Sequence, residues 1–338
     1  MYRKGLKSNL MGILFNLFKL VLAAIISIFL LSIIVYFYDF SGVHIKTEHL
    51  ATDYSWEPYQ IVHKLDEGLA YVKMDQNGYN NLEYPCIDVS DYIIMGSSQM
   101  ESFNVAQTHN TTALLNKLYN INAYNIGISG HTFYHCLNNF ENAIERFTPQ
   151  TGVVIVTDDI WLNTDNMNTV LKGEWEHIKS YDSGIIFMLQ KKIPAIKALY
   201  KKVTDWRNAE IQASITIKSP LDKEYCNYLY ALLGNASYIS KENDIRLYIL
   251  YQPRTKISAD GCYIRDSDAE AINVFSSICE EFGITFVDMT DPFERLYNEQ
   301  HILAHGFANT AVGYGHLNKY GHAIIAEKLA SVIQGVEE

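Results

Sequence analysis

Five short apolar runs, spaced between residues 92 and 287, limit the folds open to this chain. They are Tyr92–Met95, Ala123–Ile126, Val153–Val156, Leu247–Leu250 and Ile284–Val287. Their side chains do not alternate between apolar and polar, and this pattern is typical of parallel strands buried on both faces. The intervening segments carry apolar residues three or four positions apart, as amphipathic helices do. The sequence therefore predicts a three-layer α/β/α fold around a mostly parallel, five-stranded sheet.

Three helices are predicted from that spacing. One carries Phe133, Leu137, Phe140, Ile144 and Phe147 on a single face, the second is marked by residues 272–282, and the last follows residue 320. Parallel sheets of this kind bind ligands beyond the carboxyl ends of their strands. The loops after the strands are therefore where functional residues are expected.

An apolar stretch near the N-terminus predicts a membrane anchor. Leu20 to Tyr38 is 19 residues long and uncharged, and about 20 such residues cross a bilayer as a helix. A secretory signal peptide is the alternative, but its apolar region is shorter and ends at a small-residue cleavage site. Four basic residues, Arg3, Lys4, Lys7 and Lys19, precede or begin the stretch. The positive-inside rule then keeps the N-terminus cytoplasmic and exports the rest of the chain.

The expected organisation is a basic arm (1–19), a transmembrane signal-anchor (20–38), a Tyr-rich lead-in (39–85) and one large domain (86–338) with a helical insertion at about 160–240. Residues 1–38 carry four positive charges and no negative one, so the formal net charge of −11 for the whole chain becomes −15 for the exported part. That charge disfavours nucleic acid and anionic lipid as partners. Five cysteines without C-x-x-C spacing signal neither a disulfide framework nor a zinc site.

A Gly-Ser-Ser sequence follows the first predicted strand, at residues 96–98. A serine on a sharp turn at the end of a parallel strand has an exposed hydroxyl, and the N–H groups of the next helix face a developing oxyanion. Ordinary helix capping is the alternative reading of the same residues. His316 precedes the last helix and would lie at the same edge of the sheet, where it could serve as the base that a serine nucleophile needs.

Three blocks of sequence together resemble the SGNH/GDSL hydrolase superfamily. They are Gly-Ser-Ser at 96–98, Asn-Ile-Gly-Ile-Ser-Gly at 125–130 and His-Leu-Asn-x-x-Gly at 316–321. The resemblance implies that Ser98 is the nucleophile, with Ser97 the weaker candidate, and that His316 is the base. It also implies an oxyanion hole formed by the N–H groups of Ser98 and Gly130, while Gly127 serves as a turn glycine.

Two positions depart from the superfamily pattern. The third block would supply an Asn oxyanion donor, but this chain has Asp158 and Asp159 there. An ionised carboxylate cannot donate a hydrogen bond, so Asp158 would have to be protonated or replaced as donor by a group such as Asn125. The usual acid, three residues before the histidine, is absent. Asp158, Asp159 and Asp288 are the candidates to orient His316, and a backbone carbonyl is the alternative.

The remaining histidines have local alternatives. His305 is expected either to contact substrate or to be satisfied within its loop, His131 to border the site, and His322 to be structural. His301 and His305 are four residues apart, but no glutamate follows His301 as it does in the metalloprotease helix motif. No metal or other cofactor is therefore expected.

The resemblance implies an extracytoplasmic serine esterase, or an O-acyltransferase, that acts through an acyl-Ser98 intermediate on acyl esters of cell-surface glycans or related polymers. The expected partners are the membrane, the acylated polymer and, for transfer, a membrane-bound acyl-donor protein. The alternative from another class is a catalytically silent module that binds a glycan or an envelope-assembly partner through the inherited cleft.

Overall fold

The computed structural model describes residues 2–38, 44–46, 54–64, 67–82, 90–158, 193, 223–265 and 269–336. It forms two compact units, one containing the N-terminal helix and the other most of residues 41–338. Each unit is described by itself. Four cysteines, Cys136, Cys226, Cys262 and Cys279, lie in the described residues and are free.

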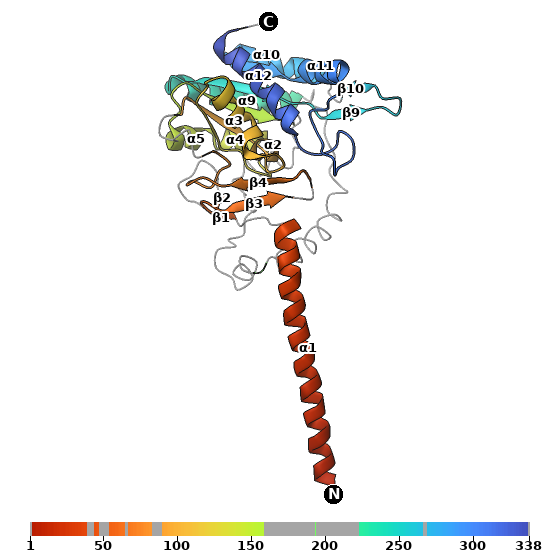
Figure 1. Cartoon of the computed structure of the whole chain (residues 1–338). Helices are drawn as coiled ribbons and strands as arrows, with labels where there is room; N and C mark the ends of the chain where they lie inside the picture. The colour runs from red at the N-terminus through yellow and green to blue at the C-terminus, as the bar shows by residue number, and fades with distance from the viewer. Residues whose placement is uncertain are drawn as a thin grey trace. The chain divides into compact units, whose positions relative to one another are not determined.

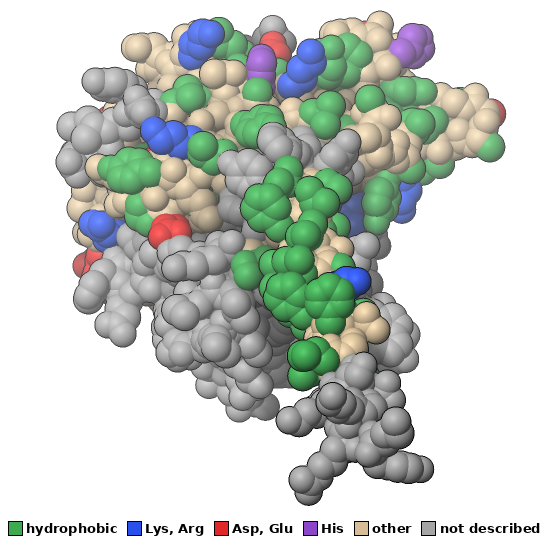
Figure 2. Space-filling model, turned by 60° about the horizontal axis from the view of Figure 1, so that its bottom comes forward, with side chains coloured by type: hydrophobic (Ala, Val, Ile, Leu, Met, Phe, Trp, Pro, Cys, Tyr) green, Lys and Arg blue, Asp and Glu red, His purple; other side chains and the backbone are tan. Residues whose placement is uncertain are grey.

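The N-terminal helix α1 runs from Tyr2 to Tyr38 (Figure 1). Its apolar part, Met11–Ile34, has 24 residues and a mean hydropathy of 2.7, which makes it long and apolar enough to cross a membrane. The helix is longer than the predicted 20–38 span because the basic arm is helical too. Exposed hydrophobic side chains dominate the part of α1 from Met11 to Ile34, in which Lys19 is the one charged residue (Figure 2).

The second unit is built on a five-stranded sheet in the order β11-β8-β7-β5-β6. The strands are β5 (Tyr92–Gly96), β6 (Ala123–Asn125), β7 (Gly152–Thr157), β8 (Arg246–Tyr251) and β11 (Thr285–Asp288). All four neighbouring pairs are parallel. The five predicted strands and their parallel arrangement are therefore confirmed, and every carboxyl end lies at the same edge.

Helices cover both faces of this sheet and make two separate cores, as the three-layer prediction required. Alternate strand residues point to opposite faces. Ile93 and Val153 pack with α4 (Phe133–Asn138), α5 (Phe140–Phe147), α9 (Lys223–Glu242) and α10 (Ala269–Phe282). Ile94 and Val154 pack with α3 (Thr111–Leu118), α11 (Thr290–Gln300) and α12 (Lys319–Gln334).

Two helical predictions differ from the structure in detail. The helix expected across residues 133–147 is two helices, because Asn139 leaves the helical conformation with ψ of 5° between α4 and α5. Helix α9 begins inside the expected insertion, yet its Leu229, Leu233 and Ala236 belong to the sheet core. The part of the insertion before α9, residues 160–222 apart from residue 193, lies outside the described residues.

The lead-in segment forms two small antiparallel sheets. One pairs β1 (His44–Lys46) with β2 (Tyr54–Trp56), and the other pairs β3 (Ile61–Lys64) with β4 (Ala70–Lys73). Apolar side chains of this segment, together with Phe103, make a third core from Trp56, Val62, Val72, Met74 and Phe103. Phe103 follows α2 (Ser98–Glu101), so this segment packs directly beside the turn that carries Ser98.

Candidate active site

Ser98 lies on the sharp turn between β5 and α2. Ser97 caps the helix, and Ser98 is its first residue. The turn is tight because α2 folds back against the strand that precedes it. A Cβ on Gly96 would lie 2.7 Å from the Met100 side chain and 3.0 Å from the carbonyl oxygen of Val156. The Ser98 side chain is therefore presented half-buried at the carboxyl edge of the sheet.

His316 contacts Ser98 directly. Its Nε2 lies 2.9 Å from Ser98 Oγ, within the range of a hydrogen bond. Further hydrogen bonds hold the histidine segment there. The Leu317 N–H donates to Gln99 Oε1 at 2.7 Å, and Asn318 caps α12 by accepting from the N–H groups of its first turn. The structure thus brings together the serine and histidine that the sequence singled out, 218 residues apart in the chain.

The acid beside His316 is Glu67, which the sequence analysis did not identify. Glu67 Oε2 lies 2.7 Å from His316 Nδ1, and Glu67 Oε1 accepts a hydrogen bond from the His316 backbone N–H. With Nδ1–H donating to the carboxylate, the Nε2 lone pair faces the Ser98 hydroxyl. This is the tautomer that a general base requires. The two side chains are only 24% and 17% exposed for His316 and Glu67, respectively.

The turn that carries Glu67 is held on both sides. It connects β3 to β4, where the Gly68 N–H donates to Asn309 Oδ1 at 2.9 Å and Asn104 Nδ2 donates to the Glu67 carbonyl at 2.9 Å. The carboxylate reaches His316 because Gly315 has φ of +115° and no side chain. A Cβ at Gly315 would overlap the Glu67 carboxylate.

Neither Asp158 nor Asp288, the two described acids considered from the sequence, orients His316. Asp158 Oδ2 lies 3.4 Å from Arg254 Nη2, and Asp288 Oδ1 accepts from the Thr290 N–H at 2.8 Å and its hydroxyl at 2.6 Å. Asp159 lies outside the described residues. Glu67 was missed because it is 249 residues before His316 in a segment with no periodicity, and only an acid beside a glycine in a short turn marks it.

The N–H groups of Ser98 and Gly130 are the expected oxyanion donors. The Ser98 N–H is at the start of α2, where helix N–H groups have no intrahelical partner. Gly130 lies in the loop after β6 with φ of +87°, a conformation that favours glycine. Neither N–H makes a hydrogen bond to any residue within the described ranges.

Glu101 ties the Gly130 loop to α2. Its side chain is 2% exposed, and its carboxylate accepts from the Ser129 hydroxyl and from Trp56 Nε1, the latter at 2.6 Å. The buried carboxylate thus joins the loop of β6, the helix of Ser98 and the lead-in segment. We infer that Glu101 sets the position of the Gly130 N–H.

Asn125 cannot replace the missing amide donor, contrary to one alternative from the sequence. It is 1% exposed, its Nδ2 donates to the Met100 carbonyl at 2.7 Å, and its Oδ1 accepts from the Gly127 N–H at 2.8 Å. These bonds make Asn125 a buried brace between β6 and α2. Gly127 is required there because a Cβ would lie 2.7 Å from Met100 Cβ.

Three further histidines, His131, His305 and His322, are buried. His305 is satisfied locally, with Gln252 Oε1 3.0 Å from Nε2 and Thr255 Oγ1 3.3 Å from Nδ1. Burial lowers the pKa of His305 and of His322 to about 3 and that of His131 to about 4. All three are therefore neutral near pH 7.

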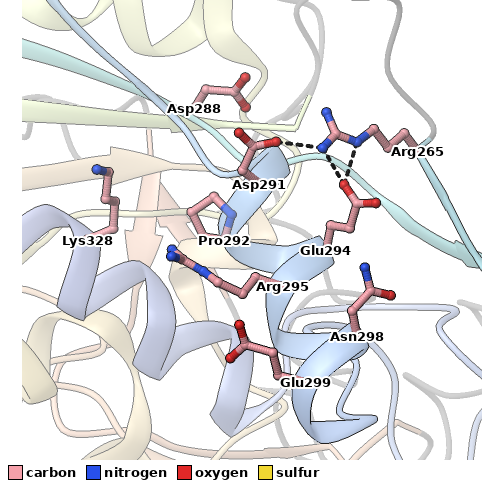
Figure 3. A pocket seen from close by; sticks show the side chains of 9 residues that line it. All are labelled: Arg265, Asp288, Asp291, Pro292, Glu294, Arg295, Asn298, Glu299 and Lys328. Carbon is pink, nitrogen blue, oxygen red and sulfur yellow. Dashed lines mark hydrogen bonds and ion pairs between the residues drawn. The ribbon is translucent and has the colours of Figure 1, made fainter. Parts of the chain in front are cut away.

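A separate pocket of about 600 Å³ lies between α11, α12 and β10 (Tyr263–Arg265). Figure 3 shows its charged lining, in which Arg265 bridges Asp291 and Glu294. Neither Ser98 nor His316 lines it, so the serine chemistry is not located there. In the described part of the chain, no three His, Cys, Asp or Glu side chains gather as metal ligands would.

Comparison with known proteins gives a likeness of fold at low identity. No protein-family model and no curated protein sequence matches the chain. Solved structures similar to it include an acetyl xylan esterase, with 13% identity, a TM-score of 0.40, and coverage of 72% of this chain and 99% of that one. A GDSL-like lipase from Bacteroides thetaiotaomicron has 15% identity, a TM-score of 0.38, and coverage of 76% and 93%.

Proposed function

We propose that the protein is a serine esterase or O-acyltransferase that works through an acyl-Ser98 intermediate. The observation that carries the proposal is the continuous hydrogen-bonded chain Ser98–His316–Glu67. His316 Nε2 lies 2.9 Å from Ser98 Oγ, and His316 Nδ1 lies 2.7 Å from Glu67 Oε2. A serine hydroxyl is a weak nucleophile until a base accepts its proton, and the base works best when a third group orients it.

In the proposed mechanism, His316 Nε2 takes the proton from Ser98 Oγ as that oxygen attacks an ester carbonyl. The imidazolium that forms is stabilised by the Glu67 carboxylate, and the N–H groups of Ser98 and Gly130 donate to the oxyanion. Collapse of the intermediate expels an alcohol, which takes the proton from His316. Water or a second alcohol, activated by the same imidazole, then attacks the acyl-enzyme.

The choice between hydrolysis and transfer depends on the acceptor. If water accepts the acyl group, the protein is an esterase. If a hydroxyl of a cell-surface glycan or related polymer accepts it, the protein is an O-acyltransferase, and a membrane-bound acyl-donor protein becomes a natural partner. The apolar α1 helix supports a membrane anchor, and the basic residues before it support a cytoplasmic N-terminus with the α/β domain outside the cell.

The test uses the full-length protein in detergent micelles, with a fluorophosphonate probe and a small aryl acetate. We expect labelling and acetate release in the wild type, and loss of both in Ser98→Ala and His316→Ala. Ser97→Ala is the matched control and should keep both, because Ser97 only caps α2. A folded wild-type protein with neither labelling nor acetate release would refute the proposed enzyme activity and favour the catalytically silent glycan-binding module.

Addition of a polyol or a glycan oligosaccharide separates the two acyl acceptors. A transferase is expected to give an acetylated acceptor at the expense of free acetate, whereas an esterase gives free acetate at an unchanged rate. Mass spectrometry of the acceptor and titration of the acetate measure the partition directly.

A further inference from the structure

The end of β7 presents a carboxylate at the edge of the sheet where Ser98 would react. Gly96 of β5 pairs with Val156 of β7. Ser98 follows Gly96 by two residues, and Asp158 follows Val156 by two residues, so both come just after the ends of neighbouring strands. Neighbouring strands are about 4.8 Å apart. A lone carboxylate at this position would oppose the negative charge that an oxyanion develops.

Arg254 supplies the opposite charge. It follows β8, the strand on the far side of β7, and its Nη2 lies 3.4 Å from Asp158 Oδ2. A guanidinium has five N–H donors in a planar fork, and this contact uses one of them. The Arg254 side chain is 71% exposed, whereas that of Asp158 is 17% exposed. Arg254 therefore has free donors beside a carboxylate that holds it at the site edge.

Side chains on either side of Arg254 contact the segment that leads to His316. Gln252 and Thr255 both bond to the His305 ring, and the next residue, Gly306, donates its N–H to the His316 carbonyl at 3.0 Å. The segment that carries Arg254 is thus connected to the His316 segment through His305 and Gly306. The Arg254 side chain extends from this fixed segment and is 71% exposed.

From this arrangement, we propose that Arg254, oriented by Asp158, donates to the oxyanion of the Ser98 reaction and completes the hole begun by the N–H groups of Ser98 and Gly130. The proposal rests on the function proposed above. As the Ser98 Oγ–carbon bond forms, the carbonyl electron pair moves onto oxygen and the hydroxyl proton passes to His316 Nε2. Arg254 stabilises that oxygen until the carbon–alkoxide bond breaks and the leaving alcohol takes the proton.

The experiment measures kcat and KM for a neutral aryl acetate with the full-length protein in micelles. Removal of one oxyanion donor costs about 10²–10³ in kcat, so we expect Arg254→Gln to lose that much with little change in KM. Lys256→Gln is the matched control, because it removes an exposed positive charge from β9 (Thr255–Ile257) nearby. Its rate should stay within twofold of the wild type.

Two double variants separate donation from simple neutralisation of Asp158. In Asp158→Asn with Arg254→Gln, the new amide is uncharged and can donate, so we expect at least a tenfold recovery over Arg254→Gln alone. In Asp158→Ala with Arg254→Gln, neither charge nor donor remains, and the rate should stay low. Wild-type activity in the alanine double variant would show that Arg254 only neutralises Asp158 and would overturn the proposal.

Two further outcomes would overturn the proposal that Arg254 donates to the oxyanion. If Arg254→Gln leaves the rate on the neutral ester within threefold of wild type and slows only an anionic ester, Arg254 binds a charged substrate group instead and the proposal is overturned. Failure of the proposed function looks different, since the wild type itself would then show no fluorophosphonate labelling at Ser98, and both proposals would fall together.

Discussion

Glu67→Gln tests the unexpected acid most sharply. The Glu67 carboxylate uses both oxygens on His316, one for Nδ1 and one for the backbone N–H. A glutamine has the same shape but one oxygen, so it can accept only one of these bonds. If that oxygen keeps the backbone N–H, the amide NH₂ faces Nδ1 and favours the tautomer with the proton on Nε2. That tautomer cannot take the proton of Ser98.

The size of the effect follows from charge and tautomer together. A unit charge pair 4 Å apart is worth about 1 kcal/mol in water and about 4 kcal/mol near a protein surface. Because both side chains are mostly shielded, we take about 2–4 kcal/mol for the loss of the carboxylate beside the imidazolium. At about 1.4 kcal/mol per tenfold change in rate, and with the tautomer cost added, kcat should fall by about 10²–10⁴.

The assay is aryl acetate turnover at saturating substrate with the full-length protein, together with the rate of fluorophosphonate labelling. Both should fall while KM changes little, because Glu67 acts through His316 and does not contact the substrate. Glu294→Gln is the matched control, since that carboxylate pairs with Arg265 outside the site. A Glu67→Gln enzyme within fivefold of wild type would refute the role of Glu67.

Three further predictions follow from the same structure. Gly315→Ala should lower kcat as much as Glu67→Gln, because its Cβ would displace the Glu67 carboxylate; unchanged turnover would contradict this. Strain at positive φ should also lower the free energy of unfolding by about 1–3 kcal/mol, measured by thermal unfolding. Gly127→Ala places a Cβ 2.7 Å from a side-chain carbon of α2 and should cost about 1–3 kcal/mol from overpacking, measured by urea unfolding; an unchanged unfolding midpoint would contradict this. The three buried histidines have pKa values held near 3 to 4 by burial, so the unfolded chain, with histidine pKa near 6.5, binds more protons below that pH. Stability should therefore be full above about pH 6.5 and fall toward pH 4, by about 2 kcal/mol per histidine between pH 7 and 5; equal unfolding midpoints at both pH values would exclude this account, and His305→Gln should flatten the dependence.

Much of the fold could be predicted because its signals are local. Apolar runs such as Tyr92–Met95 and Val153–Val156 are short, continuous and flanked by helical periodicity, and the observed strands β5 and β7 extend them by only one or two residues. Helix boundaries were less predictable. The break at Asn139 between α4 and α5 leaves the apolar face continuous, so periodicity alone does not reveal it.

The sequence by itself determined the α/β class, the apolar N-terminal helix and the pairing of Ser98 with His316. It could do so because a parallel sheet collects the carboxyl ends of its strands at one edge, whatever the details of packing. Only the tertiary structure decided that Glu67 orients the histidine, that Asn125 is a buried brace and that Arg254 pairs with Asp158. Each of these depends on contacts between segments far apart in the chain, which the docking of the β3–β4 turn and the packing of neighbouring loops create, and no local pattern encodes them.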